Sequence, residues 1–331
     1  MENHSIGTDT ININEGSEKY VVVIGAANID IGGTPLKPLV PADSNPGEIS
    51  INYGGVGRNI AHNLAMLGVP VRFITAIGGD VLGNDMLKNC EEIGMDVSHV
   101  LRLPDRTSSM YLYINNTGGD MEMAIDHMNI IRQITPNYLD SLRSVIQGAT
   151  AVVVDANITE DSFIHIKSLC RAPLYVDPVS TVLASGIKPN LDGVDTLKPN
   201  RLEAEYLTGM TIQTEADFRA AADAILGMGV RRVFLSMGKE GMMAADKNNI
   251  YIIGEQPADV VCTTGAGDSA TAAIVWASTV VADGYSLVTA AKAANAVAAM
   301  TVSVQETNYP GLSHSSALEM MINSNMTVRR I

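Results

Sequence analysis

The chain has 331 residues, of which 46% are hydrophobic and 18% are charged, so it is long enough to bury one large core. Its 22 basic and 36 acidic residues give a formal net charge of −14, and no Lys- or Arg-rich run occurs. These features argue against nucleic acid or an anionic membrane surface as a partner, and they favour a small molecule.

The N-terminal residues 1–18 are polar and acidic, and no run approaches the roughly 18 apolar residues of a membrane-spanning helix. We therefore expect a disordered leader over 1–18 and one folded domain over 19–331. The three cysteines, Cys90, Cys170 and Cys262, are isolated and lack the spacing of a zinc site. Such cysteine usage is typical of a reducing, cytoplasmic compartment.

Short β-branched runs alternate along the chain with longer segments of helical period that end in Gly. This alternation predicts an α/β fold of three layers, αβα, with a mostly parallel sheet. The predicted strands lie at 21–27, 71–78, 151–157, 173–179, 195–200 and 231–238. The helical segments between them include 60–68, 85–94, 203–209 and 216–229.

One region departs from this alternation. Residues 107–125 alternate polar with apolar side chains around a turn at 115–120, and residues 48–53 alternate too. We expect a small antiparallel β sheet that stands off the main domain, built from about 32–53 and 107–126. Its free strand edges could be covered by a second copy, so we expect a homodimer through this sheet.

Near the C-terminus, Gly265, Ala266 and Gly267 precede an apolar helical segment that starts at about Ser269. Small residues leave the first backbone N–H groups of a helix uncovered, and such a helix start attracts anions. Asp268 beside this anion hole could act as a general base toward a hydroxyl during phosphoryl transfer. The alternative is that Thr264 or Asp268 merely caps the helix.

A second glycine cluster, in the segment 52–68, also leads into an amphipathic helix. It lacks the spacing of a P-loop and of a dinucleotide-binding loop. Its glycines could simply allow close packing of a helix on a strand.

Taken together, the two clusters carry a family resemblance. Residues 54–61, GGVGRNIA, are similar to the N-terminal signature of the PfkB (ribokinase-like) sugar and nucleoside kinases, and residues 263–268, TTGAGD, are similar to their C-terminal signature. Residues 198–203 and 236–241 resemble two further elements of the family. The resemblance implies a ribokinase-like fold, one kinase domain over 19–331, a β lid, and phosphorylation by ATP with Mg²⁺.

Several further segments resemble the versions found in family members that act on the C-nucleoside pseudouridine. They are 25–30, 42–49, 107–130, 155–158, 176–180 and 196–207. The resemblance implies transfer to the 5′-hydroxyl of pseudouridine. A broader nucleoside or ribose kinase, or a non-catalytic nucleoside-sensing protein on the same fold, stays open as an alternative.

The resemblance also suggests roles for individual residues. Asp268 is expected to be the base, with the anion hole formed by Gly265, Ala266 and Gly267. The nucleoside is expected to contact Asn28, Asp30, Gly54, Gly55, Gly57, Asn59, Thr107 and Ser109. ATP is expected to contact Asn200, Glu203, Ser236, Gly238, Gly241 and Asn295, with Glu203 also reaching Mg²⁺ through water.

Three of these roles have plain alternatives. Asp30 could be a turn aspartate, Asn200 with Glu203 could be a capped helix start, and Asn295 could be close-packed core. Cys262 stands where the family usually carries an Asp that helps to bind a monovalent cation. Because a thiol is a poor ligand for K⁺, activation by K⁺ is in doubt.

Overall fold

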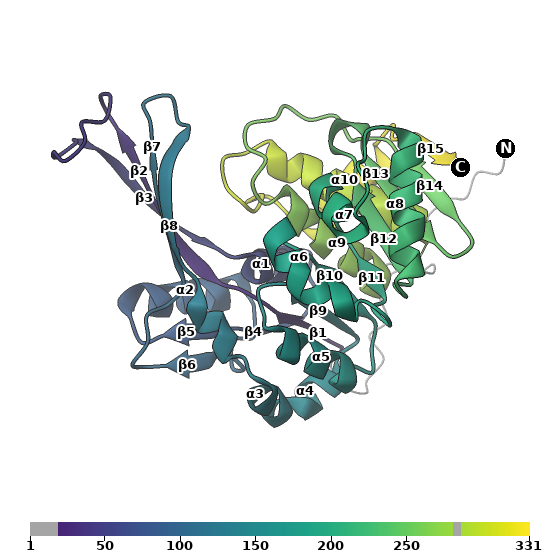
Figure 1. Ribbon diagram of the computed structural model, residues 1–331, viewed down its shortest axis with the longest axis horizontal. Helices are drawn as coiled ribbons and strands as arrows, with labels where there is room; N and C mark the ends of the chain where they lie inside the picture. Colours follow the sequence, from purple (N-terminus) through teal and green to yellow (C-terminus); the bar gives the residue numbers. More distant parts are fainter. Residues whose placement is uncertain (1–18, 281–285) are drawn as a thin grey trace.

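The computed structural model describes residues 19–280 and 286–331, so the leader expected over 1–18 lies outside the described residues. Within them, the large sheet has nine strands in the order β15-β14-β13-β12-β11-β10-β9-β1-β4 (Figure 1). The pairs from β4 to β12 are parallel, and β13, β14 and β15 pair antiparallel. The strands of this sheet are β1 (Val21–Ile24), β4 (Val71–Ile74), β9 (Ala151–Asp155), β10 (Leu174–Asp177), β11 (Thr196–Leu197), β12 (Arg232–Ser236), β13 (Met242–Asp246), β14 (Ile250–Ile253) and β15 (Val328–Arg330).

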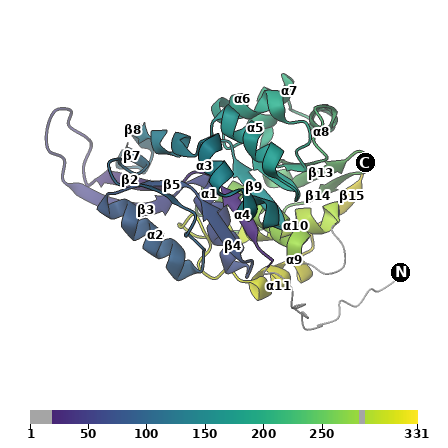
Figure 2. The same cartoon turned by 90° about the horizontal axis from the view of Figure 1, so that it is seen from below.

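Helices cover both faces of this sheet, and each face has its own apolar core. Figure 2 shows α5 to α8 on one side and α9 to α11 on the other. None of the described helices is long and apolar enough to cross a membrane. One face carries α1 (Val56–Met66), α2 (Val81–Ile93), α9 (Ala266–Val280), α10 (Leu287–Val302) and α11 (His314–Ile322). The other carries α3 (Pro136–Ser141), α4 (Arg143–Gly148), α5 (Glu160–Leu169), α6 (Thr181–Ile187), α7 (Arg201–Thr208) and α8 (Glu215–Gly227).

The sequence correctly predicted the three layers and all six parallel strands, but every predicted range is longer than its strand, and one range covers two strands. The run 71–78 is mostly apolar, yet it forms β4 and then a separate strand β5 (Ala76–Gly78). β4 pairs with β1, whereas β5 leaves the large sheet to pair with β6 (Leu101–Leu103). Hydrophobicity alone does not show where a strand changes partners.

A second sheet of four strands projects from the main body in the order β3-β2-β7-β8 (Figure 1). β2 (Asn28–Pro35) and β3 (Gly47–Gly54) form one antiparallel hairpin, and β7 (Met110–Asn115) and β8 (Met121–His127) form the other. The turn expected at 115–120 lies between β7 and β8. The two hairpins meet through a parallel pairing of β2 with β7, and the sheet begins at Asn28 rather than near residue 32.

The order of the large sheet positions a ligand site. β4 and β9 lie on opposite sides of β1, so the connections that leave the carboxyl end of β1 and of β9 diverge. In open α/β sheets a ligand crevice forms outside the carboxyl ends of the strands at such a point. The small sheet leaves the main body at this same edge, directly after β1.

Candidate active site

The start of α9 holds the first site residue. Gly265 has a φ of +83°, and a Cβ there would overlap the backbone of Thr307, so the bend before the helix requires glycine. Asp268 lies in the first turn, but it does not cap the helix: its Oδ2 accepts a hydrogen bond of 2.8 Å from the side-chain amide of Asn59 on α1. Of the predicted anion hole, the N–H groups of Gly265 and Gly267 donate to no described residue, and neither does that of Asp268, so they remain available to an anion. The Ala266 N–H instead donates to the Thr263 carbonyl at 3.4 Å, so this part of the prediction is wrong.

Asp268 has a strongly perturbed acidity. Burial, and next the nearby carboxylate of Asp177, raise its pKa to about 7, while the Asn59 hydrogen bond and the Lys198 charge act in the opposite direction. A carboxylate with a pKa near 7 is suited to accept a proton at neutral pH. The environment of Asp268 therefore fits a base better than a helix cap.

A buried ion pair lies beside it. The ammonium of Lys198, just after β11, is 3.2 Å from Oδ2 of Asp177 at the end of β10, and Thr271 on α9 donates to the same oxygen at 2.7 Å. Lys198 and Asp177 are only 5% and 4% exposed. A Cβ on Gly267 would lie 3.1 Å from the Lys198 nitrogen, so the small residue lets this cation approach the helix start.

A third strand end holds the first glycine cluster against the sheet. Asp155, at the end of β9 and fully buried, accepts hydrogen bonds from the backbone N–H groups of Ala26 at 2.8 Å and Gly57 at 2.7 Å. Burial raises its pKa to about 6 against these hydrogen bonds. A Cβ on Gly57 would overlap the backbone of Gly25, so the close approach of α1 to β1 depends on glycine.

At the root of the small sheet, Asn28 donates a 2.5 Å hydrogen bond from its amide to Oδ1 of Asp30. Burial raises the pKa of Asp30 to about 6, and the Asn28 hydrogen bond opposes this shift. A Cβ on Gly54 would overlap the Asp30 carboxylate, and Gly55 begins α1 with a φ of +97°. Asp30 is therefore a hydrogen-bonded strand residue, and not the turn aspartate considered as its alternative.

The structure gives less support to the two remaining predicted nucleoside contacts, Ser109 and Thr107. The Ser109 carbonyl accepts from the N–H of Ile29 and so ties β7 to β2, while the Ser109 side chain is buried. Thr107 is exposed in the loop before β7. The structure brings Asn28, Asp30 and Asn59 to one edge of the sheet, but gives Thr107 no hydrogen bond to a described residue.

At the start of α7, Asn200 and Glu203 form a reciprocal capping box. Asn200 accepts from the Glu203 N–H at 2.9 Å, while Glu203 Oε2 accepts from the Asn200 N–H at 2.9 Å and Oε1 from its side-chain amide at 2.6 Å. Glu203 is buried, and burial and the Asp177 charge raise its pKa while Lys198 opposes the shift. The cap that one interpretation of this pair required is present, but that interpretation also expected a solvated Glu, and Glu203 is buried at the cavity.

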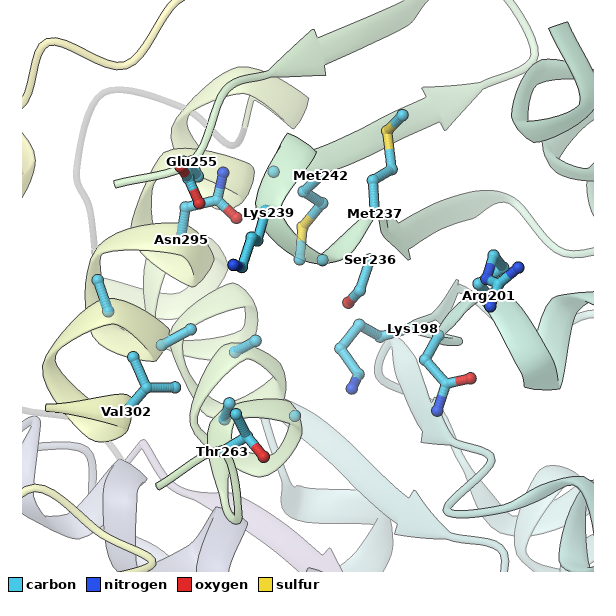
Figure 3. Close-up of a pocket in the computed structure, with 18 of the residues that line it drawn as sticks. Lys198, Arg201, Ser236, Met237, Lys239, Met242, Glu255, Thr263, Asn295 and Val302 are labelled. Carbon is cyan, nitrogen blue, oxygen red and sulfur yellow. The ribbon is translucent and has the colours of Figure 1, made fainter. Parts of the chain in front are cut away.

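A cavity of about 720 Å³ opens between α7, the β12–β13 turn, and the helices α9 and α10. Figure 3 shows Lys198 and Ser236 on one side of it, with Asn295 and Val302 on the other. Most of the predicted nucleotide and catalytic residues line it together. They are Asn200, Glu203, Ser236, Gly238, Gly241, Ala266, Gly267, Asp268 and Asn295.

Asn295 and Cys262 make contacts that bear on the roles considered for them. The Asn295 amide donates to the carbonyls of Ile253 at 3.2 Å and Gly254 at 2.9 Å, so it also fixes the end of β14. Cys262 has a free thiol, and its N–H donates to the Val302 carbonyl at 3.2 Å. Within residues 19–280 and 286–331, no group of three His, Cys, Asp or Glu side chains could hold a metal ion.

Sequence reasoning assigned no role to Asp155, Asp177 or Lys198, although all three lie at the site. Each stands at or just after the carboxyl end of a parallel strand, β9, β10 and β11 in turn. A polar residue that ends each of several consecutive apolar strands is a signal for a ligand edge. That signal was present in the sequence.

Known proteins resemble this chain over most of its length. A family model described as pfkB family carbohydrate kinase matches residues 18–314. A pseudouridine kinase from Escherichia coli strain K12 is 36% identical over 314 residues, covering 92% of this chain and 97% of the relative. A guanosine-inosine kinase from Exiguobacterium acetylicum is 29% identical over 260 residues, covering 77% and 86%. The structure of Arabidopsis thaliana ribokinase complexed with ribose and ATP superimposes with a TM-score of 0.81 at 23% identity, covering 93% of this chain and 100% of that one.

Proposed function

Because the chain belongs to the pfkB family of carbohydrate kinases, we propose that it transfers the γ-phosphoryl group of ATP to the 5′-hydroxyl of pseudouridine. The products are pseudouridine 5′-phosphate and ADP. The observation that carries the kinase chemistry is the position of Asp268, at the uncapped N–H groups of α9 and beside the cavity that Lys198 also lines. The choice of nucleoside rests on the 36% identity to a pseudouridine kinase over nearly the whole of both chains.

Asp268 takes the proton of the 5′-hydroxyl as the oxygen forms its bond to the γ-phosphorus. The bond between that phosphorus and the bridging oxygen breaks, and ADP leaves with the electron pair. Asn59 holds the carboxylate through its 2.8 Å hydrogen bond, which fixes the direction from which Asp268 receives the proton. Asp30 accepts hydrogen bonds from the ribose hydroxyls at the root of the small sheet.

Two parts of the site stabilise the negative charge on the transferring phosphoryl group. The free N–H groups of Gly267 and Asp268 donate to its oxygens at the start of α9. The Lys198 ammonium, held by Asp177, supplies a fixed positive charge in a site shielded from water. Phosphoryl transfer depends mainly on such positioning and electrostatic stabilisation.

The residues around Glu203 suit magnesium held through water. Both Glu203 oxygens already accept hydrogen bonds from Asn200, and each keeps one acceptor position for a water. The lack of a three-residue ligand cluster in the described chain agrees with an ion that keeps most of its own waters. Mg²⁺ bound with ATP would neutralise charge on the phosphates. For K⁺ we propose only weak stimulation, because Cys262 offers a thiol.

We assign the small sheet, formed by β2, β3, β7 and β8, the role of a lid over the nucleoside. Its strand β2 carries Asp30, and its far end reaches well beyond the main body (Figure 1). Closure of this sheet would exclude water from the reacting groups, so that ATP is not hydrolysed in place of transfer.

We further propose that two copies pair through the face of this sheet opposite Asp30. That face is apolar and open to solvent: Ile49 is 77% exposed and Ile125 is 69% exposed, with Ile51, Leu112 and Met123 between them. Exposed apolar patches of this kind mark association surfaces. A second copy offers the same apolar face, so the contact can be self-complementary. The three free cysteines agree with a reducing, cytoplasmic location.

The direct test is a phosphorylation screen of the purified chain with ATP against pseudouridine, uridine, inosine, guanosine, free ribose and free fructose. We expect the highest kcat/KM with pseudouridine, and a product phosphorylated at the 5′ position by NMR. A higher kcat/KM for another nucleoside or for ribose would replace pseudouridine as the substrate. No ATP consumption with any acceptor would favour a nucleoside-sensing protein.

A further inference from the structure

The small sheet has two chemically different faces, and its strand register determines which residues share each face. Asp30 and Gly32 on β2 lie opposite Asn52 and Ser50 on β3, and paired residues of neighbouring strands point to the same side. On the other flank of β2, Asp30 is level with Tyr111 and Gly32 is level with Tyr113. The face that carries the ribose-binding Asp30 is therefore also the face that carries two tyrosines.

These two rings lie together next to Asp30. Their centroids are 5.8 Å apart and the ring planes are tilted by 35°. A Cβ on Gly32 would overlap the Tyr113 ring, so the ring lies directly against the β2 backbone. Glycine at this position thus allows the Tyr113 ring to lie close to the β2 backbone and to present an aromatic surface.

The spacing fits a nucleoside. Residues two apart on a strand are separated by about 7 Å, so Gly32 and the ring above it lie about 7 Å from Asp30. This separation is comparable to the distance from the 2′- and 3′-hydroxyls of a ribose to its attached base. A ribose held by Asp30 would place its base on the tyrosines, whereas a free sugar would leave them without a partner.

We propose that Tyr111 and Tyr113 form a stacking platform for the nucleobase and make this site selective for nucleosides over free sugars. The inference rests on the proposed nucleoside kinase function. Stacking of a base on an aromatic side chain is strong and tolerant of the identity of the base. The platform therefore separates nucleosides from ribose, and it does not by itself separate pseudouridine from uridine.

The experiment compares Tyr111→Leu and Tyr113→Leu with Tyr111→Phe and Tyr113→Phe, measuring kcat and KM for pseudouridine and for free ribose. Leucine keeps an apolar side chain but removes the aromatic ring, whereas phenylalanine keeps the ring. We expect each leucine variant to raise the KM for pseudouridine on the order of 10-fold to 100-fold with little change in kcat. The KM for ribose should stay unchanged, and the phenylalanine variants should resemble the wild type.

Tyr206→Leu is the matched control, because it removes the ring of a tyrosine that is 41% exposed on α7, outside the small sheet. Calorimetric titration of pseudouridine into each variant gives a binding readout that does not depend on catalysis. Equal changes in KM for pseudouridine and ribose, or phenylalanine variants as weak as the leucine variants, would overturn the platform while leaving the kinase function intact. A wild-type enzyme that prefers free ribose to every nucleoside would overturn both proposals.

Discussion

The side-chain amide of Asn59 and the carboxylate of Asp268 are joined by a 2.8 Å hydrogen bond across 209 residues of sequence. Asn59 lies on α1, just after the first glycine cluster, and Asp268 lies on α9, just after the second. The bond lowers the pKa of Asp268 against the stronger effect of burial. It thus links the first glycine cluster to the proposed base.

Removing this hydrogen bond should change the pH dependence of the reaction. The pKa of Asp268, about 7 in the wild type, should rise in Asn59→Ala because the charged form loses a donor. A base is inactive when protonated, so the acid limb of kcat/KM should move to higher pH, with activity falling roughly 10-fold below pH 6. Asn89→Ala, which removes a partner of Arg58 and not of Asp268, is the control. A limb that stays in place in Asn59→Ala would exclude Asp268 as the titrating group.

Replacing the proposed base itself gives a stronger effect. Asp268→Asn keeps the shape of the side chain and an oxygen that can accept from Asn59, but it cannot take a proton. We expect kcat to fall about 10²-fold or more, with ATP affinity and thermal stability near the wild type. Single-turnover phosphorylation and calorimetric ATP binding measure the two quantities. Asp259→Asn, at an exposed carboxylate just before the motif, should have no effect. Activity of Asp268→Asn within a few-fold of the wild type contradicts the base role.

For Lys198, catalysis and stability can be separated with a double variant. Lys198→Met leaves Asp177 buried without its cation, which should lower the free energy of unfolding by about 3–5 kcal/mol. Asp177→Asn combined with Lys198→Met removes both charges, so most of that stability should return. If Lys198 stabilises the transferring phosphoryl group, kcat should stay roughly 10²-fold low in the double variant. Denaturant unfolding and initial rates test the two effects, and recovery of kcat together with stability would reduce Lys198 to a structural role.

Glu203 can likewise be tested for two roles at once. Glu203→Gln retains the reciprocal cap with Asn200, because glutamine also serves in capping boxes, but it removes the charge. Glu203→Ala removes both and should lose about 1 kcal/mol of stability. If Glu203 holds magnesium waters, both variants should need more Mg²⁺ for half-maximal rate, whereas only the alanine variant should unfold more easily. An unchanged Mg²⁺ requirement in Glu203→Gln would leave Glu203 as a cap alone.

The apolar face of the small sheet predicts the oligomeric state. Ile49→Lys and Ile125→Lys place charges on the face opposite Asp30, and we expect them to convert a dimer to a monomer in light scattering after size exclusion. Val182→Lys is the matched control, because Val182 is 76% exposed but lies on α6, away from this sheet. A wild-type protein that is monomeric at working concentration would reject pairing through the sheet.

Local sequence patterns were sufficient for much of the fold. The alternation of β-branched runs with helical periods predicted the parallel sheet and its layers, and the polar-apolar alternation around 115–120 predicted the hairpin of β7 and β8. These features are set by side-chain periodicity and turn residues within a few positions, which a sequence displays directly. The two glycine motifs were found for the same reason, because each is a continuous stretch.

Tertiary structure alone decided which distant side chains meet. The change of partners within 71–78 depends on β6 lying beside β5, and the hydrogen bond from Asn59 to Asp268 depends on the packing of α1 against α9. The ion pair of Lys198 with Asp177 exists because β10 and β11 are parallel neighbours whose carboxyl ends reach the same edge. Local patterns in the sequence were enough to find most of the elements and both glycine motifs. Their contacts were decided by strand order and register, since these bring together residues that no local pattern relates.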